Sequence, residues 1–345
     1  MKKKIIILTD RKFRKTDFTG LSYSYLRAFE KRGFECDLVS LNINPYLYYI
    51  INKYYPKKLN NYLKLKQKSI IEYIKRLDKT LVFVVKGYYL LPETIEEIKS
   101  FKKMIVCFNP DDPFSPIIGS SSNCIKASIP FFDQYFIWTK SLIEPIKKAG
   151  CKNVHYLPFA SDSDLLNPAK LSTEINIPDM KCDVSFVGNA DKERIEFIVS
   201  LSNSLDGSLN KFIYGSRWAN INGFKVNGNV DGIYFINAIC SSKINLNILR
   251  LQNKNSNNMR TFEIPAIGGF MLHEYSEEAM EFFKPEVEAD YFKSPDECAD
   301  KIKYYLKNEE LRKKIAKAGH GKIFTARHLY TDRVDEFWEK VATLM

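Results

Sequence analysis

Short apolar runs alternate along the chain with segments in which apolar residues recur every three or four positions. The first run, residues 4–8, stops at Thr9 and Asp10, and the run at 81–85 is continuous and rich in branched residues. Runs of this kind are typical of strands buried on both faces of a parallel sheet. The alternation therefore predicts repeated βαβ units.

In the first half, glycine and proline punctuate the pattern. Gly33 and Gly150 stand where helix C-terminal caps are expected, and Pro92 stands at a helix start. These signals predict a doubly wound parallel sheet. Its predicted strands are 4–8, 35–41, 81–85, 104–108, 135–138 and 154–157, and its predicted helices are 21–32, 92–101 and 141–149.

A polar stretch with two prolines, residues 167–179, predicts a linker, after which the pattern restarts. The second half therefore predicts another Rossmann-like sheet followed by helices. Ligands of such sheets bind beyond the carboxyl ends of the strands, so the loops there are the first places to search. The predicted strands are 182–187, 211–214, 244–248, 270–273 and 287–291, and the predicted helices are 192–205, 233–240, 259–267, 295–306, 309–317 and 329–341.

Composition adds a few exclusions. The 345 residues suit two domains, and no apolar run reaches the roughly 18 residues of a membrane-spanning helix. The start is basic, but its apolar run is too short for a signal peptide, so a cytoplasmic protein is expected. The seven cysteines are scattered without CxxC pairs, which predicts free thiols rather than disulfides or a zinc site.

Positive charge is concentrated in the first third. The net charge is +11, whereas residues 1–110 alone carry +13, and residues 53–79 hold nine bases and two acids among several tyrosines. A solvated helix face explains this pattern. A surface for acidic lipid headgroups or a phosphorylated acceptor explains it as well. No nucleic-acid-binding motif accompanies the charge, so no nucleic-acid partner is expected.

Motifs for common cofactors are missing from the sequence. It contains no GxGxxG, no GxxxxGK[ST], no HExxH and no GxSxG, and its four histidines lack ligand spacing. We therefore expect no nicotinamide, flavin or metal.

The first candidate binding segment, residues 186–194, is a predicted strand that runs into a glycine turn and a helix start. Gly188 would let the backbone approach a phosphate closely, and free N–H groups at a helix N-terminus favour an anion. Lys192 and Arg194 follow and add positive charge. An ordinary strand-to-helix turn with surface bases accounts for the same pattern.

The second candidate segment, residues 255–269, places Glu263 inside an otherwise apolar predicted helix that ends at a double glycine. A buried carboxylate is costly without partners, and this one could accept hydrogen bonds from two ribose hydroxyls. A structural ion pair with Arg260 explains the glutamate equally well, because helix residues three positions apart are neighbours.

A pair of aspartates follows the predicted strand at 104–108. Asp111 or Asp112 at a strand's end could act as a general base on an acceptor hydroxyl. The same stretch of Asn, Asp and Pro also favours a simple turn.

A glycine and a cation follow the predicted strand at 211–214. Gly215 and Arg217 are placed to contact a phosphate or a nucleotide base. Alternatively, the loop only lets Trp218 cover the core.

These segments together resemble a known family. The second half is similar to the C-terminal domain of the CgeB-like (spore-maturation-type) glycosyltransferases of the GT-B clan, and the first half fits more loosely. The matching positions are 182–188 with Arg194, Tyr214 and Gly215 with Trp218, 258–269, 292–297, 304–306, Arg312, 315–319, His328, Tyr330 and Arg333, and in the first half Lys86 and Gly87, Pro92 and Glu93, 111–113 and 156–158 with Pro168.

The resemblance implies a GT-B fold, in which two Rossmann-like domains with doubly wound parallel sheets face each other across a cleft. It implies an acceptor-side domain at 1–168, a domain at 179–327 that binds a nucleotide-sugar donor, and a last helix, 328–345, that crosses back to the first domain. It also implies no metal, since helix N-termini and basic side chains offset the diphosphate charge.

The family's donor-binding residues carry over onto matching positions here. Arg194 and Lys192 would hold the diphosphate, Glu263 would bind the donor ribose, and Asn258 and Arg260 would lie beside the sugar or phosphates.

Related retaining enzymes often carry two glutamates eight positions apart, whereas the earlier position here is Asn255. This departure leaves the donor sugar and the stereochemical outcome open.

The expected function is transfer of a sugar from a nucleotide-diphosphate sugar to a hydroxyl in surface polysaccharide or glycoconjugate synthesis. The acceptor would be a glycan or a lipid-linked molecule, and the basic region 53–79 would contact an anionic membrane at its inner face. A nucleotide-sugar epimerase or hydrolase on the same fold, and a non-catalytic glycan-binding protein, are the alternatives.

Overall fold

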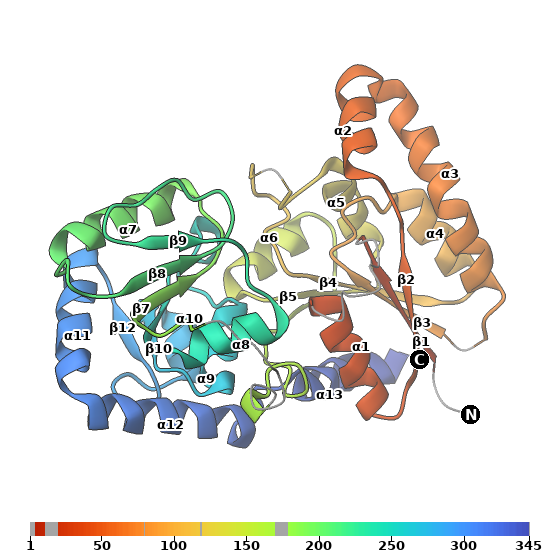
Figure 1. The fold of residues 1–345 in the computed structure, drawn as a ribbon. Helices are drawn as coiled ribbons and strands as arrows, with labels where there is room; N and C mark the ends of the chain where they lie inside the picture. The colour runs from red at the N-terminus through yellow and green to blue at the C-terminus, as the bar shows by residue number, and fades with distance from the viewer. Residues whose placement is uncertain (1–3, 11–19, 79, 118, 170–178, 345) are drawn as a thin grey trace. The chain divides into compact units, whose positions relative to one another are not determined.

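The computed structural model describes residues 4–10, 20–78, 80–117, 119–169 and 179–344 (Figure 1). Its contacts divide the chain into two compact units. Unit 1 comprises Met1–Pro158 together with Thr331–Met345, and unit 2 comprises Phe159–Tyr330. Most of the linker predicted at 167–179 lies outside the described residues.

Unit 1 contains a six-stranded, fully parallel sheet with the strand order β2-β1-β3-β4-β5-β6. The order reverses between β1 and β3, as it does in a doubly wound sheet. Its strands are β1 (Lys4–Thr9), β2 (Glu35–Ser40), β3 (Thr80–Val85), β4 (Met104–Asn109), β5 (Gln134–Ile137) and β6 (Val154–Tyr156). Its helices are α1 (Leu21–Lys31), α2 (Pro45–Tyr54), α3 (Pro56–Lys75), α4 (Pro92–Ser100), α5 (Asn123–Ser128), α6 (Ile143–Lys148) and α13 (Tyr330–Val341).

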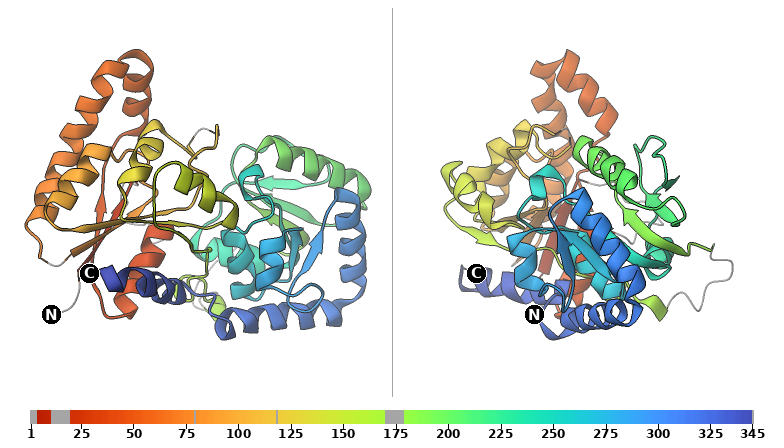
Figure 2. Two further views of the ribbon diagram at one scale, coloured as in Figure 1. Left: turned by 180° about the vertical axis from the view of Figure 1, so that it is seen from behind. Right: turned by 90° about the vertical axis from the view of Figure 1, so that its left-hand side faces the viewer.

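Both faces of this sheet are covered. Parallel crossovers are right-handed, so the reversal at β1 puts α1 on one face and α3, α4 and α5 on the other. Figures 1 and 2 show α13 on the α1 side of the sheet. Phe337 of α13 packs edge-on against Phe29 of α1 and Phe83 of β3, with ring centroids 5.6 and 5.2 Å apart. The end of the chain therefore completes the core of unit 1.

Unit 2 repeats the design with the strand order β12-β11-β10-β7-β8-β9, again fully parallel. Here the order reverses between β7 and β10. The strands are β7 (Cys182–Val187), β8 (Lys211–Tyr214), β9 (Lys225–Asn227), β10 (Ser242–Asn247), β11 (Met271–Glu274) and β12 (Asp290–Phe292). The helices are α7 (Lys192–Ser204), α8 (Gly232–Cys240), α9 (Met259–Ile267), α10 (Glu277–Phe282), α11 (Pro295–Lys307) and α12 (Glu309–Thr325).

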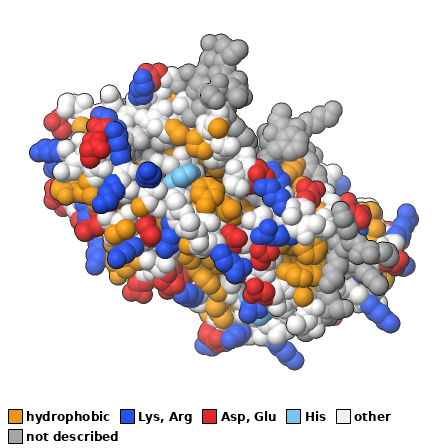
Figure 3. Space-filling model, turned by 90° about the horizontal axis from the view of Figure 1, so that it is seen from below, with side chains coloured by type: hydrophobic (Ala, Val, Ile, Leu, Met, Phe, Trp, Pro, Cys, Tyr) orange, Lys and Arg blue, Asp and Glu red, His pale blue; other side chains and the backbone are white. Residues whose placement is uncertain are grey.

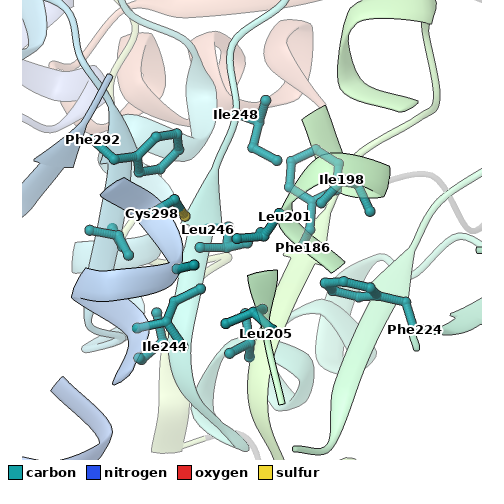
Figure 4. Packing of buried hydrophobic residues seen from close by; sticks show 14 of the residues in the cluster. Phe186, Ile198, Leu201, Leu205, Phe224, Ile244, Leu246, Ile248, Phe292 and Cys298 are labelled. Carbon is teal, nitrogen blue, oxygen red and sulfur yellow. The ribbon is translucent and has the colours of Figure 1, made fainter. Parts of the chain in front are cut away.

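The main core of unit 2 lies between its sheet and helices α7 and α11. Phe186 of β7 and Leu246 of β10 meet Ile198 of α7 and Cys298 of α11 there, and all four are almost fully buried (Figure 4). Burial of apolar surface contributes roughly 25 cal/mol of favourable free energy per Å², so this core stabilises the arrangement of the strands and helices of unit 2. Two doubly wound parallel sheets confirm the predicted fold class.

Several local predictions were wrong or incomplete. The patterns did not predict α2, α3, α5, α10 or β9 as separate elements, although a helix face was one interpretation of residues 53–79. The predicted strand 287–291 begins only at Asp290, because the preceding residues turn and Glu286 has a left-handed φ of 60°. The predicted helix 309–317 continues to Thr325, because Gly319 does not end it. A Cβ at Gly319 would lie 2.3 Å from the Glu288 carbonyl oxygen, so this glycine permits close packing.

Charges of both signs are interspersed on the face shown in Figure 3, between small apolar areas. Such mixing is typical of an ordinary solvated surface. Among the described helices, none is both long and apolar enough to cross a bilayer.

Candidate functional site

The carboxyl ends of β7 and β10 lie side by side where the strand order of unit 2 reverses. In open parallel sheets this is the place where ligands bind. The loop after β7 contains Gly188, and the loop after β10 contains Ile248 and Arg250. The candidate donor site is built from these two loops, the loop after β8, and the beginnings of α7 and α9.

The loops after β7 and β8 are in direct contact. Gly188 N–H donates to Tyr214 O at 2.8 Å, and the indole N–H of Trp218 donates to Gly188 O, also at 2.8 Å. A Cβ at Gly215 would lie only 2.1 Å from Gly188 O. Gly215 is therefore needed so that the two loops can pack together, and Trp218 both closes the loop and packs edge-on against Phe186.

Replacing Gly215 with alanine is expected to destabilise unit 2 by about 2–4 kcal/mol, because backbone would have to move to admit the methyl group. Thermal or urea unfolding measures this loss. Gly207→Ala is the matched control, since nothing lies within 4 Å of its added Cβ. Equal stability of the two variants would contradict the close-approach role of Gly215.

Arg194 lies beneath these loops. It is 7% exposed, and its Nε and Nη2 donate to Ile248 O at 3.0 and 2.7 Å, while Nη1 donates to Asn189 O at 3.2 Å. Burial lowers the pKa of its guanidinium to about 10. Arg194 thus ties the loop after β7 to the loop after β10. Its assignment to the diphosphate stays a prediction, as does that of Lys192, whose exposed amine lies 3.9 Å from Glu196.

Asp191 caps the N-terminus of α7, where its Oδ1 accepts from Arg194 N–H at 3.0 Å. Its Oδ2 lies 3.7 Å from Nη1 of Arg194 and 3.6 Å from Nε of Arg250. The Arg250 side chain is about one-third exposed, so it presents a partly accessible cation beside the helix N-terminus.

At the start of α9, Arg260 and Glu263 form the ion pair that the sequence suggested, from Nη1 to Oε2. Arg260 Nε also donates to Val187 O at 3.3 Å, and its guanidinium lies over the Phe235 ring, 4.2 Å from the centroid. Glu263 is 8% exposed. The two residues are thereby held at the carboxyl end of β7, and contact of Glu263 with a ribose remains a prediction.

Asn258 is the N-terminal cap of α9. Its Oδ1 accepts from Thr261 N–H at 3.0 Å, and its Nδ2 donates to Asn247 Oδ1 at 2.8 Å. Arg217 is exposed, with a left-handed φ of 64°. The structure therefore places the predicted residues Gly188, Arg194, Asn258, Arg260 and Glu263 around the β7–β10 edge, with Gly215 and Arg217 in the neighbouring loop.

A buried histidine, His273 of β11, is hydrogen-bonded to Thr261 at the start of α9. His273 Nδ1 lies beside Glu274 O, which only accepts, so this nitrogen carries the proton. Nε2 then accepts from the Thr261 hydroxyl at 2.9 Å. Full burial lowers the pKa of His273 to about 4, because a charged imidazole would lose its hydration.

His273 is expected to make the protein sensitive to acid. The unfolded chain takes up this proton near pH 6.5 and the folded chain only near pH 4, so the stability present above pH 6.5 is lost as pH falls between them. The loss should reach about 2–3 kcal/mol. Unfolding measured at pH 7 and 4.5 should show a smaller difference for His273→Gln than for the unchanged protein, and an equal difference would contradict the assignment.

In unit 1, a charged cluster lies where the strand order reverses between β1 and β3. Lys86, with a left-handed φ of 75°, directs Nζ to Asp111 Oδ2 at 2.6 Å and to Gly119 O at 2.5 Å. Asp10 directly follows β1, and its Oδ2 accepts from Tyr88 N–H at 2.7 Å. Asp112 Oδ1 instead accepts from Phe114 N–H at 2.8 Å, which is the turn contact that its sequence also favoured.

Sequence reasoning missed Asp10, Asp191, Arg250 and Glu274. Burial raises the pKa of Asp10 to about 6 and also raises the pKa of Glu274, whose Oε2 accepts from Leu249 N–H at 2.8 Å. All but Asp191, the helix cap, lie at a strand's end or within three residues beyond it, and this position is the sequence signal that could have identified them. Among the described residues, no group of three or more His, Cys, Asp or Glu is arranged to hold a metal ion.

Comparison with known proteins adds independent findings. Residues 194–339 match the model of a family described as glycosyl transferase-like. No curated protein shows significant sequence similarity to the chain.

Three similar solved structures have the GT-B fold. A glycosyltransferase from Rickettsia africae is 13% identical with a TM-score of 0.65, and the match covers 99% of both chains. A trehalose 6-phosphate synthase from Burkholderia multivorans is 11% identical with a TM-score of 0.67, covering 100% of this chain and 97% of that one. Anabaena HepE, solved with UDP-glucose, is 10% identical with a TM-score of 0.61, covering 98% and 99%. The family model and the shared GT-B fold therefore support a glycosyltransferase family for this chain.

Proposed function

We propose that this protein transfers a sugar from a nucleotide-diphosphate sugar to an acceptor hydroxyl. The observation that carries the proposal is the placing of Arg260 and Glu263 together at the β7–β10 edge, within the part of the chain that matches the family model. The GT-B neighbour HepE, solved with UDP-glucose, supports a nucleotide-sugar donor. The finer assignment to the CgeB-like branch and to surface polysaccharide or glycoconjugate synthesis is part of the proposal.

In the donor unit, cations would offset the charge of the leaving diphosphate. Arg250 and Arg260 are partly exposed, so they can reach a ligand, whereas the three engaged donors of Arg194 hold the loops that shape the site. Cations fixed before the reaction stabilise charge that develops on the leaving group. With these cations and Lys192 nearby, we propose a reaction that requires no metal ion.

Glu263 would accept hydrogen bonds from the two ribose hydroxyls. A carboxylate offers acceptor sites beyond the one used by Arg260, and its position on a buried helix fixes its direction. This contact would orient the donor rather than take part in bond breaking.

In unit 1, Asp111 would serve as the base for an inverting transfer. Lys86 Nζ contacts its Oδ2 at 2.6 Å, which orients the carboxylate and keeps it ionised, as a base requires. The acceptor would be a glycan or a lipid-linked molecule, and the enzyme would work in the cytoplasm at the inner face of a membrane.

Nucleotide binding tests this proposal. A thermal-shift and calorimetry screen with UDP, GDP, dTDP, CDP and CMP is expected to show one base bound selectively, because a ligand stabilises the folded state by mass action. Donor turnover without any acceptor would favour the epimerase or hydrolase alternative. Failure of every nucleotide and nucleotide sugar to bind, with and without candidate acceptors, would favour the non-catalytic alternative.

A further inference from the structure

Helix α2 exposes several large apolar and aromatic side chains. None of its ten residues is buried. Tyr46 is 73% exposed, Tyr49 55% and Tyr54 62%, and Leu47 and Tyr55 are also exposed. Figure 1 shows α2 at the projecting end of the hairpin that it forms with α3. A cluster of exposed aromatic side chains such as this one is typical of a surface that binds a membrane or another molecule.

The charge around this aromatic tip has one sign. Between Asn44 and Ile71 the chain contains six lysines and no Asp or Glu. Of these lysines, Lys64 pairs with Glu93 at 3.5 Å, whereas the others form no ion pair with any described residue. Lys53 lies over the rings of Tyr49 and Tyr54, 5.7 and 5.1 Å from their centroids. The hairpin therefore presents cations and tyrosines together, unlike the mixed charges of the face in Figure 3.

The opposite side of the hairpin is firmly attached to unit 1. Helix α3 buries residues spaced three or four apart, Leu63, Gln67, Ile70, Ile71 and Ile74. The Gln67 amide donates to Tyr89 O at 3.0 Å and accepts from Leu91 N–H at 3.2 Å. In α2, Tyr48 packs edge-on against Tyr89, with ring centroids 4.8 Å apart. The hairpin thus has one side packed on unit 1 and another side, with Tyr46, Leu47 and Tyr49, that is exposed.

We propose that the α2–α3 hairpin docks on an anionic lipid bilayer, with the tip Tyr46–Tyr55 at the level of the headgroups. Tyrosine suits this boundary, because its ring prefers the apolar side and its hydroxyl remains in water. The unpaired lysines attract lipid phosphates. A second copy of the chain is a poor occupant, because it would bring the same six lysines against these.

This inference deepens the proposed membrane location and moves the contact. The sequence analysis predicted the membrane contact in the basic region 53–79. The exposed tyrosines of the structure begin before that region, at Tyr46. The tyrosines of the tip would be buried shallowly among the lipid headgroups, and the lysines of α3 would supply positive charge. Interfacial binding depends on both contributions, so neither alone should suffice.

Flotation with vesicles tests the docking. The full chain is expected to float with phosphatidylcholine vesicles containing about one-third phosphatidylglycerol, not with pure phosphatidylcholine, and to be released by added salt. Tyr46→Ser/Tyr49→Ser/Tyr54→Ser keeps the charge, and Lys57→Gln/Lys58→Gln/Lys66→Gln keeps the tyrosines. Each is expected to lower the partition coefficient about tenfold or more.

Tyr304→Ser/Lys307→Gln on α11 is the matched control, because Tyr304 is 51% exposed and Lys307 also lies at the surface. Its partition coefficient should equal that of the unchanged protein. Absence of binding to anionic vesicles, or equal binding by both hairpin variants, would overturn the proposal. So would a dimer in light scattering that the tyrosine substitutions dissociate. Nucleotide binding measured without vesicles reports on the proposed function separately, so either proposal can fail alone.

Discussion

Glu263→Ala is expected to lower the affinity for the nucleotide sugar or its nucleotide about tenfold or more. The substitution would remove the proposed hydrogen bonds from two ribose hydroxyls to this carboxylate, each worth about 1.5–3 kcal/mol. It also leaves Arg260 without its ion-pair partner at the carboxyl end of β7. Calorimetry with the nucleotide selected in the screen measures the change, and donor kinetics provide a second readout.

The controls separate binding from structure. Glu277→Ala removes an exposed carboxylate from α10 and should leave donor affinity unchanged. Arg260→Ala breaks the same ion pair while keeping the carboxylate, so it should lower affinity through the phosphates and leave ribose discrimination intact. If Glu263→Ala lowers the melting temperature but not the affinity for nucleotide, the ion pair is purely structural and the ribose role is refuted.

Asp111→Asn is expected to reduce turnover about a hundredfold or more if the reaction inverts, because general-base catalysis contributes about 10²–10⁴. Affinity for the donor should remain unchanged, since the proposed donor contacts belong to unit 2. An amide at this position keeps the shape of the side chain and a contact with Lys86 through its oxygen, but it cannot accept a proton. Initial rates with saturating donor and acceptor give the effect.

Asp112→Asn is the matched comparison. Its Oδ1 accepts from Phe114 N–H within the turn, and an amide oxygen can do the same, so little change is expected. Intact turnover in Asp111→Asn/Asp112→Asn would remove both residues from catalysis. If Asp10→Asn alone abolishes turnover, the base is Asp10, whose buried position after β1 raises its pKa to about 6.

Local pattern predicted most of the fold because strands and helices in a doubly wound protein are encoded by short-range periodicity. The continuous apolar run at 81–85 became β3, and Pro92 and Gly33 mark the start of α4 and the end of α1. The same logic failed where contacts override local signals. The helix predicted to end at residue 317 continues to Thr325, and Gly319 lies inside it, where the Glu288 carbonyl packs closely.

The candidate site was only partly readable in advance. Arg260 and Glu263 are three residues apart, so helix geometry alone suggested their pairing. The cluster of Asp10, Lys86 and Asp111 joins three loops, of which the outer two lie 101 residues apart in sequence. Only the strand order brings these loops together. Similarly, Arg194 donates to the backbone carbonyls of Asn189 and Ile248. A sequence pattern does not indicate which backbone carbonyls will accept hydrogen bonds from a given side chain.

The sequence by itself therefore determined the two parallel sheets, the strand-end loops and the residue types available in them, because these depend on spacing along the chain. Only the tertiary structure decided which of these residues meet, which are buried and which stay exposed. In the folded protein Arg194 donates to backbone carbonyls, Arg250 is partly exposed, and Tyr46, Tyr49 and Tyr54 of α2 are exposed. The physical reason is that burial and partner choice depend on strand order and packing between distant segments, and spacing within one segment carries no information about either.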